Sequence, residues 1–219
     1  MDRIKVLYCA YREWALRAVD SLPYPLSVVS TPEALEKEYD TFAPDLIFLI
    51  GWSWKVPERI WNKTVTLCMH PSPLPLYRGG CPIQHQILNG EEESKVTFFR
   101  VDGGVDTGPI VLQKDYSLDG DIRDILSRVR RLIIPMVYDL IQKFPDYEYK
   151  SQDGVATFFP RRRSDQSQLV ELPNRSAKDV YNFIRALGDP YPNAFIKCRD
   201  GNVYLKGASL GTQSTDTGK

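Results

Sequence analysis

His70 and Asp106 are the two residues of this chain whose types and surroundings best suit acid/base chemistry. His70 ends a short apolar run, residues 65–69, and precedes three prolines in five residues. Asp106 lies in a glycine-rich stretch, residues 102–108, whose backbone amides can approach a ligand closely. A neutral imidazole with a carboxylate in reach can take a proton from an attacking amine. The two segments therefore predict one pocket for an acid/base transfer reaction.

Each of these residues also has a purely structural interpretation. A histidine can cap a strand through a backbone hydrogen bond, and Asp106 can brace an Asx-type turn. Arg78 can hold an anionic group or form a surface salt bridge. Gly79, Gly80 and the 103–108 stretch are expected to supply amides for a developing oxyanion. The choice depends on which elements bring these residues together.

The elements that must position them follow from hydrophobic patterns. Strands are expected at residues 4–9, 26–29, 45–50, 65–69, 96–101 and 110–116. Helices are expected at residues 10–22, from 31, from 56, at 82–89 and at 121–144, the last kinked or broken at Pro135. This alternation predicts an α/β fold with a Rossmann-like, mostly parallel sheet flanked by helices. Because the prolines stop its strand, His70 is expected at the carboxyl edge, where such sheets collect ligands.

The pattern changes after the polar stretch 145–154. We expect a catalytic domain at residues 1–150, a small α+β C-terminal subdomain at 151–210 and a flexible Ser/Thr/Gly-rich tail at 211–219. The subdomain is expected to hold a strand at 155–159, a helix at 177–187 capped by Ser176, and strands near 194–197 and 202–206.

Composition excludes several classes of protein. The 219 residues include 28 basic and 28 acidic side chains, a balance that argues against nucleic-acid binding despite the short run RRR at 161–163. Four cysteines without a C-x-x-C pair suggest neither a metal site nor a disulfide scaffold, and they fit a reducing cytoplasm. No leader or membrane span is expected. The first strand is followed by no glycine fingerprint, which argues against NAD or FAD.

One segment carries a specific resemblance. Residues 70–113, HPSPLPLYRGGCPIQHQILNGEEESKVTFFRVDGGVDTGPIVLQ, resemble the formyltransferase family that uses N10-formyltetrahydrofolate. The family pattern joins an N-x-H-x-S-x-L-P-x-Y-R-G loop to a D-x-G-x-D-T-G loop through a P-I-x-x-x-I-x-N-G helix. The resemblance is close over about residues 45–115 and looser elsewhere. The pieces FFPRRRS and FIRALGDPYPNAF are more similar to members acting on nucleotide-linked amino sugars than to those acting on initiator tRNA.

The resemblance implies an Asn-His-Asp catalytic set. His70 and Asp106 match two of its members, and Cys68 stands where the asparagine is expected. Positions two apart on a strand face the same side, so Cys68 should point where the amide would lie. A thiol is a poorer hydrogen-bond partner for the formyl oxygen.

The resemblance also implies binding residues and partners. The folate co-substrate is expected to be bound by Trp52, Trp54, Asp102, Gly103 and Val105. The acceptor, a nucleotide-linked amino sugar, is expected to be bound by Pro71, Ser72, Tyr77, Arg78 and Gly79. Residues 161–163 and 189–192 are further candidates for its diphosphate and sugar. The tryptophans fit core packing as well as an aromatic lip. Similar sugar formyltransferases imply a homodimer joined through C-terminal elements.

Three functions stay open. The favoured one is direct attack of the sugar amine on the formyl carbon, with His70 and Asp106 handling protons. A second is a covalent formyl thioester on Cys68, activated by His70. A third is ligand binding without turnover. Within the enzyme hypotheses, a ribosyl glycinamide or an aminoacyl group is the alternative acceptor.

Overall fold

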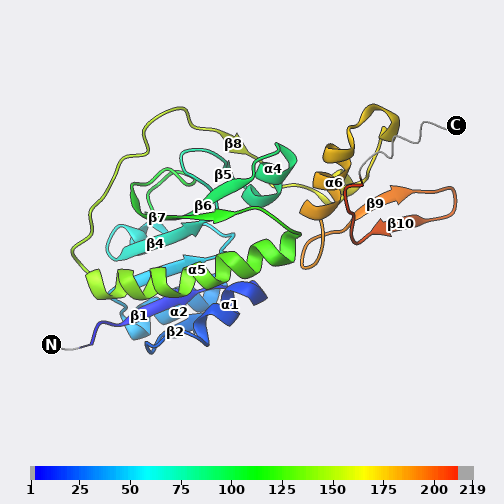
Figure 1. Ribbon diagram of the computed structural model, residues 1–219. Helices are drawn as coiled ribbons and strands as arrows, with labels where there is room; N and C mark the ends of the chain where they lie inside the picture. Colours follow the sequence, from blue (N-terminus) through cyan, green and yellow to red (C-terminus); the bar gives the residue numbers. More distant parts are fainter. Residues whose placement is uncertain (1–2, 212–219) are drawn as a thin grey trace, which may run out of the picture.

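The computed structural model describes residues 3–211 and shows a six-stranded mixed sheet between layers of helices, with a smaller C-terminal unit beside it (Figure 1). The strand order is β2-β1-β3-β4-β6-β7. The strands are β1 (Val6–Cys9), β2 (Ser27–Val29), β3 (Leu46–Ile50), β4 (Val65–His70), β6 (Glu93–Arg100) and β7 (Ile110–Ser117). The first four pair in parallel, and β6 runs antiparallel to both β4 and β7. The predicted mostly parallel α/β fold is confirmed.

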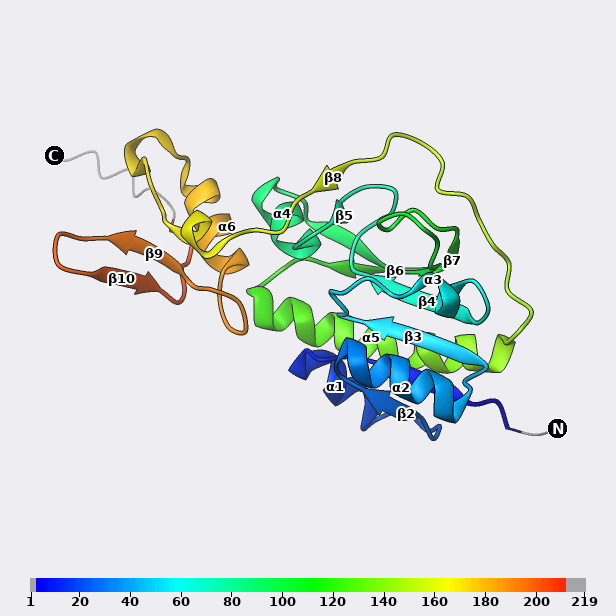
Figure 2. The ribbon, with the colours of Figure 1, turned by 180° about the vertical axis from the view of Figure 1, so that it is seen from behind.

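The central strands are apolar because both of their faces are covered. Along β1, Val6 and Tyr8 belong to one core, whereas Leu7 and Cys9 belong to the other. Helices α1 (Glu13–Val19) and α5 (Ile122–Lys143) pack in the first core. Helices α2 (Pro32–Phe42) and α3 (Glu58–Trp61) pack in the second (Figure 2).

Helix ends follow the local signals. The Thr31 hydroxyl accepts a hydrogen bond from the Ala34 amide at 3.2 Å, and Asp121 and Asp124 form a capping box at the start of α5. Of the two expectations for Pro135, the break is wrong, because α5 runs through this residue as one element, and the kink stays a prediction. One lost backbone hydrogen bond is outweighed by the apolar stripe that the helix buries.

Several elements have bounds that differ from the expected ranges, and β6 and α1 are two of them. Strand β6 begins at Glu93 and not at the expected residue 96, because β7 extends to Ser117 and pairs with residues 93–95. Helix α1 is shorter at both ends than the expected 10–22. Helix α4 (Pro82–Leu88) follows its prediction, and Gly90 beyond it has a φ of 83°.

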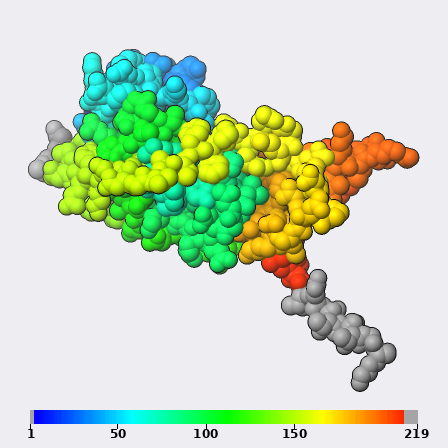
Figure 3. Space-filling model, turned by 90° about the horizontal axis from the view of Figure 1, so that it is seen from above, coloured from blue at the N-terminus to red at the C-terminus, as the bar shows by residue number. Residues whose placement is uncertain are grey.

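After α5 the chain returns across the sheet domain. Lys150 forms an isolated bridge with Ile110, and β8 (Phe158–Phe159) pairs in parallel with β5 (Arg78–Gly79). Figure 3 shows this yellow-green to yellow stretch lying over the surface of the body. The strand expected in the C-terminal subdomain therefore pairs with the catalytic part, and we propose that the boundary falls after it, near Pro160.

The C-terminal unit contains the expected helix and hairpin. Its elements are η1 (Ser164–Ser167), η2 (Leu172–Asn174), α6 (Ala177–Ala186), β9 (Ala194–Lys197) and β10 (Asn202–Leu205). Ser176 caps α6, and the antiparallel β9–β10 hairpin projects away from the body (Figures 1 and 2). The expected tail lies outside the described residues except for Gly211. Over residues 3–211, no helix has the length and apolar character that crossing a membrane would require.

Candidate active site

His70 is the last residue of β4 and is 6% exposed. Its Nε2 lies 2.7 Å from the carbonyl oxygen of Tyr77. Because a carbonyl oxygen can only accept, Nε2 carries the proton and donates it. The other ring nitrogen, Nδ1, then keeps a free lone pair and is the basic atom of the neutral imidazole.

Nδ1 of His70 faces Asp106, whose Oδ2 lies 3.6 Å away. This distance is too long for a direct hydrogen bond, and neither a lone-pair nitrogen nor an ionised carboxylate has a proton to donate. A proton taken up by Nδ1 would be stabilised by the adjacent carboxylate at a site largely shielded from water. The structure thus brings together the two residues from which the sequence predicts an acid/base pair.

A glycine fixes the Asp106 carboxylate. Oδ2 of Asp106 accepts a hydrogen bond of 2.8 Å from the backbone amide of Gly79. Gly79 has a φ of 94°, and a Cβ there would lie 2.3 Å from the carbonyl oxygen of Phe159. Only glycine fits this backbone conformation in this space.

The expectation of free glycine amides for an oxyanion is wrong for three of the glycines. Gly79 donates to Asp106, and Gly80 donates to the carbonyl oxygen of Phe159 at 2.8 Å. Gly104 donates to Oδ1 of Asp102 at 2.9 Å. The Asp106 carboxylate, the β5–β8 pairing and an Asx turn thus use these three donors, because buried backbone amides pair with acceptors in the folded chain.

Cys68 lies two residues before His70 on β4. Burial raises the pKa of its thiol well above the ordinary value, and the negative charge of Asp106 raises it further. The thiol therefore stays protonated at neutral pH, which disfavours a nucleophilic role. An effect of the Asp106 charge on Cys68 requires the two side chains to be near each other. This agrees with the prediction that Cys68 and His70 point to the same face of their strand. Cys68 packs against the second core, and its Sγ donates a long hydrogen bond of 3.9 Å to the Met69 carbonyl oxygen.

The loop after His70 holds itself together. The hydroxyl of Ser72, which is fully buried, donates to the carbonyl oxygen of Leu76 at 2.7 Å. The buried Tyr77 hydroxyl donates to Glu91 at 2.7 Å. The carbonyl oxygen of Pro71 accepts two side-chain hydrogen bonds. These groups shape the loop, and their contact with substrate stays a prediction.

Arg78 binds Gln152, a residue that the sequence did not single out. Its Nε and Nη2 donate to Oε1 of Gln152 at 3.1 and 2.7 Å. The Nε2 of Gln152 donates in turn to the carbonyl oxygens of Asp106 and Gly108, at 2.9 and 2.7 Å. Thr157, also unnoticed, accepts the Tyr77 amide at 2.8 Å. Gln152 lies in the polar stretch 145–154 and Thr157 lies in the expected strand 155–159, and no pattern in the sequence singles out either residue.

Trp52 and Trp54 follow β3, which neighbours β4, so they lie at the sheet edge that carries His70. Their ring centroids are 4.9 Å apart, and Trp54 packs on Tyr11 at 4.5 Å. Trp54 is 42% exposed. The cluster offers aromatic surface at the same sheet edge as His70, as a flat ring ligand would need.

The other residues expected to contact folate lie in the Asp106 loop. Asp102 accepts hydrogen bonds from the Gly104 amide and, at 2.6 Å, from the Thr107 hydroxyl. Gly103 and Val105 are exposed at the tip of this loop. A bound folate contacting all three stays a prediction.

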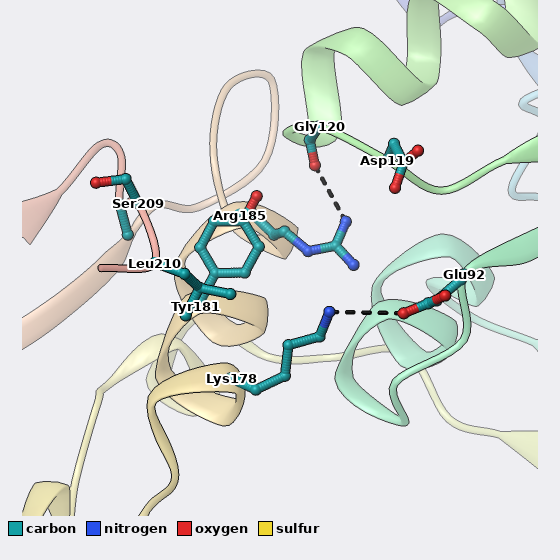
Figure 4. A pocket seen from close by; sticks show the side chains of 9 residues that line it. Glu92, Asp119, Gly120, Lys178, Tyr181, Arg185, Ser209 and Leu210 are labelled. Atoms are coloured by element: carbon teal, nitrogen blue, oxygen red, sulfur yellow. Dashed lines mark hydrogen bonds and ion pairs between the residues drawn. The ribbon is translucent and has the colours of Figure 1, made fainter. Parts of the chain in front are cut away.

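A cavity of about 350 Å³ lies elsewhere, between α6 and the start of α5 (Figure 4). Lys178 pairs with Glu92 at 3.6 Å, and Nη1 of Arg185 donates to the Gly120 carbonyl oxygen at 3.1 Å. Its basic groups are balanced by Glu92 and Asp119. None of the predicted site residues lines it.

Comparison with known proteins gives the family. The formyl transferase model matches residues 25–130, and the formyl transferase C-terminal domain model matches residues 164–219. The methionyl-tRNA formyltransferase of Kosmotoga olearia is 31% identical over 174 residues, which are 76% of this chain and 55% of that protein. The chain thus spans about half the length of this curated relative.

Solved structures share the fold. The structure of methionyl-tRNA formyltransferase from Clostridium thermocellum has a TM-score of 0.86 and 28% identity, covering 95% of this chain and 94% of that one. A sugar N-formyltransferase from Shewanella sp. FDAARGOS_354 has a TM-score of 0.75 and 16% identity, covering 96% and 100%. The formyl donor of this family is N10-formyltetrahydrofolate. By its sequence and its fold, the chain belongs to the formyl transferase family of enzymes.

Proposed function

We propose that this protein transfers the formyl group of N10-formyltetrahydrofolate to the amine of a nucleotide-linked amino sugar. The observation that carries this proposal is the orientation of His70, whose Nε2 is committed to Tyr77 and whose basic Nδ1 faces Asp106. A base held in this way is suited to take a proton from an amine as it attacks.

The reaction proceeds by direct attack. The neutral acceptor amine forms a bond to the formyl carbon, and its extra proton passes to Nδ1 of His70. Asp106 stabilises the imidazolium that results. The tetrahedral intermediate then collapses by breaking the bond to the folate N10, which takes up the proton. Atoms and charges balance without a covalent enzyme intermediate.

Cys68 has a different role from the nucleophile of the thioester hypothesis. Its protonated thiol, on the same face of β4 as His70, is the donor that we propose for the formyl oxygen. A thiol donates weakly, so stabilisation of the oxyanion is modest here.

The acceptor proposal is supported by the charge balance of the chain and by its likeness to a sugar formyltransferase fold over almost its whole length. The proposed diphosphate contacts are Arg78 and residues 161–163. We also propose a homodimer joined through C-terminal elements.

A second acceptor is favoured by a specific observation. The Kosmotoga olearia relative and the Clostridium thermocellum structure are both methionyl-tRNA formyltransferases. An aminoacyl-tRNA amine is therefore the alternative acceptor, with the same chemistry at His70 and Asp106.

One experiment separates these acceptors. The purified protein is incubated with N10-formyltetrahydrofolate and either a panel of nucleotide-linked amino sugars or methionyl-tRNA, and product mass is measured. We expect one sugar to gain a formyl group. Formylated methionyl-tRNA with unreacted sugars would overturn the acceptor proposal and leave the chemistry, whereas no product at all would refute formyl transfer.

A further inference from the structure

We propose that Gln152 is a positioning residue for Asp106 and that it sets the catalytic rate without contacting substrate. This inference rests on the proposed formyl transfer. Gln152 lies in the 150–160 segment, well outside the two motifs by which the chain resembles its family.

The primary amide of Gln152 is fully used. Its oxygen accepts from Nε and Nη2 of Arg78, and its nitrogen donates to the carbonyl oxygens of Asp106 and Gly108. Two acceptor positions and two donors are all that a glutamine side chain has. The side chain therefore ties the end of the His70 loop to the Asp106 loop by four hydrogen bonds.

Asp106 needs this support because its own backbone is strained. It has a φ of 54°, in the left-handed region that few residues other than glycine occupy, although an aspartate is less strained there than most side chains. The neighbouring Val105 is 50% exposed and contributes little packing. The hydrogen bond from Gln152 Nε2 to the carbonyl oxygen of Asp106 therefore holds Asp106 in the orientation that directs its Oδ2 toward His70.

Gln152 is itself anchored on both sides. Lys150, two residues before it, exchanges backbone hydrogen bonds of 2.7 and 2.8 Å with Ile110. Thr157, five residues after it, binds the backbone of Tyr77 and Arg78. The 150–160 segment is thus a brace across both loops, and Gln152 is the residue in it that reaches Asp106.

The first test separates positioning from binding. In Gln152→Leu we expect kcat to fall about 100-fold, the cost of a misplaced catalytic group, with the KM for folate changed less than threefold. Gln152→Glu keeps oxygen acceptors for Arg78 but removes both N–H donors to the Asp106 and Gly108 carbonyl oxygens. We therefore expect its kcat to fall almost as far as that of the leucine variant. The matched control is Gln142→Leu, which changes an exposed glutamine near the end of α5 and should keep the wild-type kcat.

The second test asks whether Gln152 acts through Asp106. We expect Asp106→Asn and the double variant Asp106→Asn/Gln152→Leu to have equal kcat, because the brace has nothing left to position. An equal Gln152→Leu loss in both backgrounds, or a loss that appears only as raised KM, would overturn the inference.

Hydrogen exchange of the free protein decides the inference even if no acceptor is turned over. Amides of residues 102–108 should exchange at least tenfold faster in Gln152→Leu than in wild type, with the exchange of β1 and β3 unchanged. Unchanged exchange in this loop would refute the positioning role. An inactive wild type with faster exchange in the variant would refute only the proposed function.

Discussion

The two loops that carry the catalytic pair are held in different ways. The His70 loop follows directly from the central strand β4 and is fixed by buried side chains, such as Thr97, whose hydroxyl donates to the Ser72 carbonyl oxygen at 2.6 Å. The Asp106 loop is exposed at its tip and depends on Gly79 and on Gln152, a residue distant in sequence. The base is thus positioned by the sheet and its core, whereas its carboxylate partner is positioned by a brace that the chain adds later.

The strongest challenge to this comparison is removal of the base. In His70→Asn we expect formyl transfer to fall about 10³-fold, because a positioned general base contributes roughly 10²–10⁴-fold. Product formation over time measures the loss. The chain contains one other histidine, His85, which stacks on Phe159. His85→Asn is the control and should lose less than threefold; equal losses would argue against a specific role for His70.

Gly79→Ala tests the link between the loops. The added Cβ meets the Phe159 carbonyl oxygen, so strain and overpacking together should cost about 2–5 kcal/mol of stability and move the amide that holds Asp106. We expect a large fall in the urea midpoint and about a 100-fold lower kcat in the folded fraction. Gly90 has a similar φ, but nothing lies within 4 Å of a Cβ added there. Gly90→Ala should therefore lose stability only through backbone strain and should keep its activity.

Cys68 offers a gain of function. Cys68→Asn restores a stronger donor two residues before the base, and we expect kcat to rise about tenfold, a fraction of the roughly 10²–10³-fold contributed by a good oxyanion donor. Steady-state kinetics measure the change, with Cys68→Ala as the matched loss of the thiol. A slower asparagine variant would show that Cys68 is not the donor for the formyl oxygen.

The smallest effect concerns the reactivity of the same thiol. The pKa of Cys68 is raised in the folded protein. Near pH ~8.5, where about half of an ordinary cysteine is thiolate, Cys68 therefore stays mostly protonated. Iodoacetamide at pH 8 should label the exposed Cys198 and leave Cys68 unmodified, with activity unchanged. Peptide mass mapping reads this out, and rapid labelling of Cys68 would reopen the thioester hypothesis.

Much of the scaffold could be predicted from the sequence, because the signals are local. The apolar run that became β3, the Thr31 cap and the strand that ends at His70 each depend on neighbours in the chain. Pairing His70 with Asp106 needed the spacing of two motifs and the rule that ligands collect at one edge of the sheet.

The rest depends on contacts between distant segments. No local pattern shows that β8 pairs with β5, or that the Gly80 amide therefore donates to the Phe159 carbonyl oxygen. Nor does any local pattern show that Gln152 hydrogen-bonds to Asp106. The antiparallel direction of β6 is equally invisible in its own residues, since it depends on the length of the connection and on β7.

The central claim is that His70 and Asp106 act as one unit in proton transfer. A double-mutant cycle of His70→Asn and Asp106→Asn, measured as kcat for formyl transfer to the best acceptor, tests it directly. We predict that the double variant is no slower than His70→Asn alone, because the carboxylate stabilises only a proton held on Nδ1. Losses that multiply in the double variant would contradict the account.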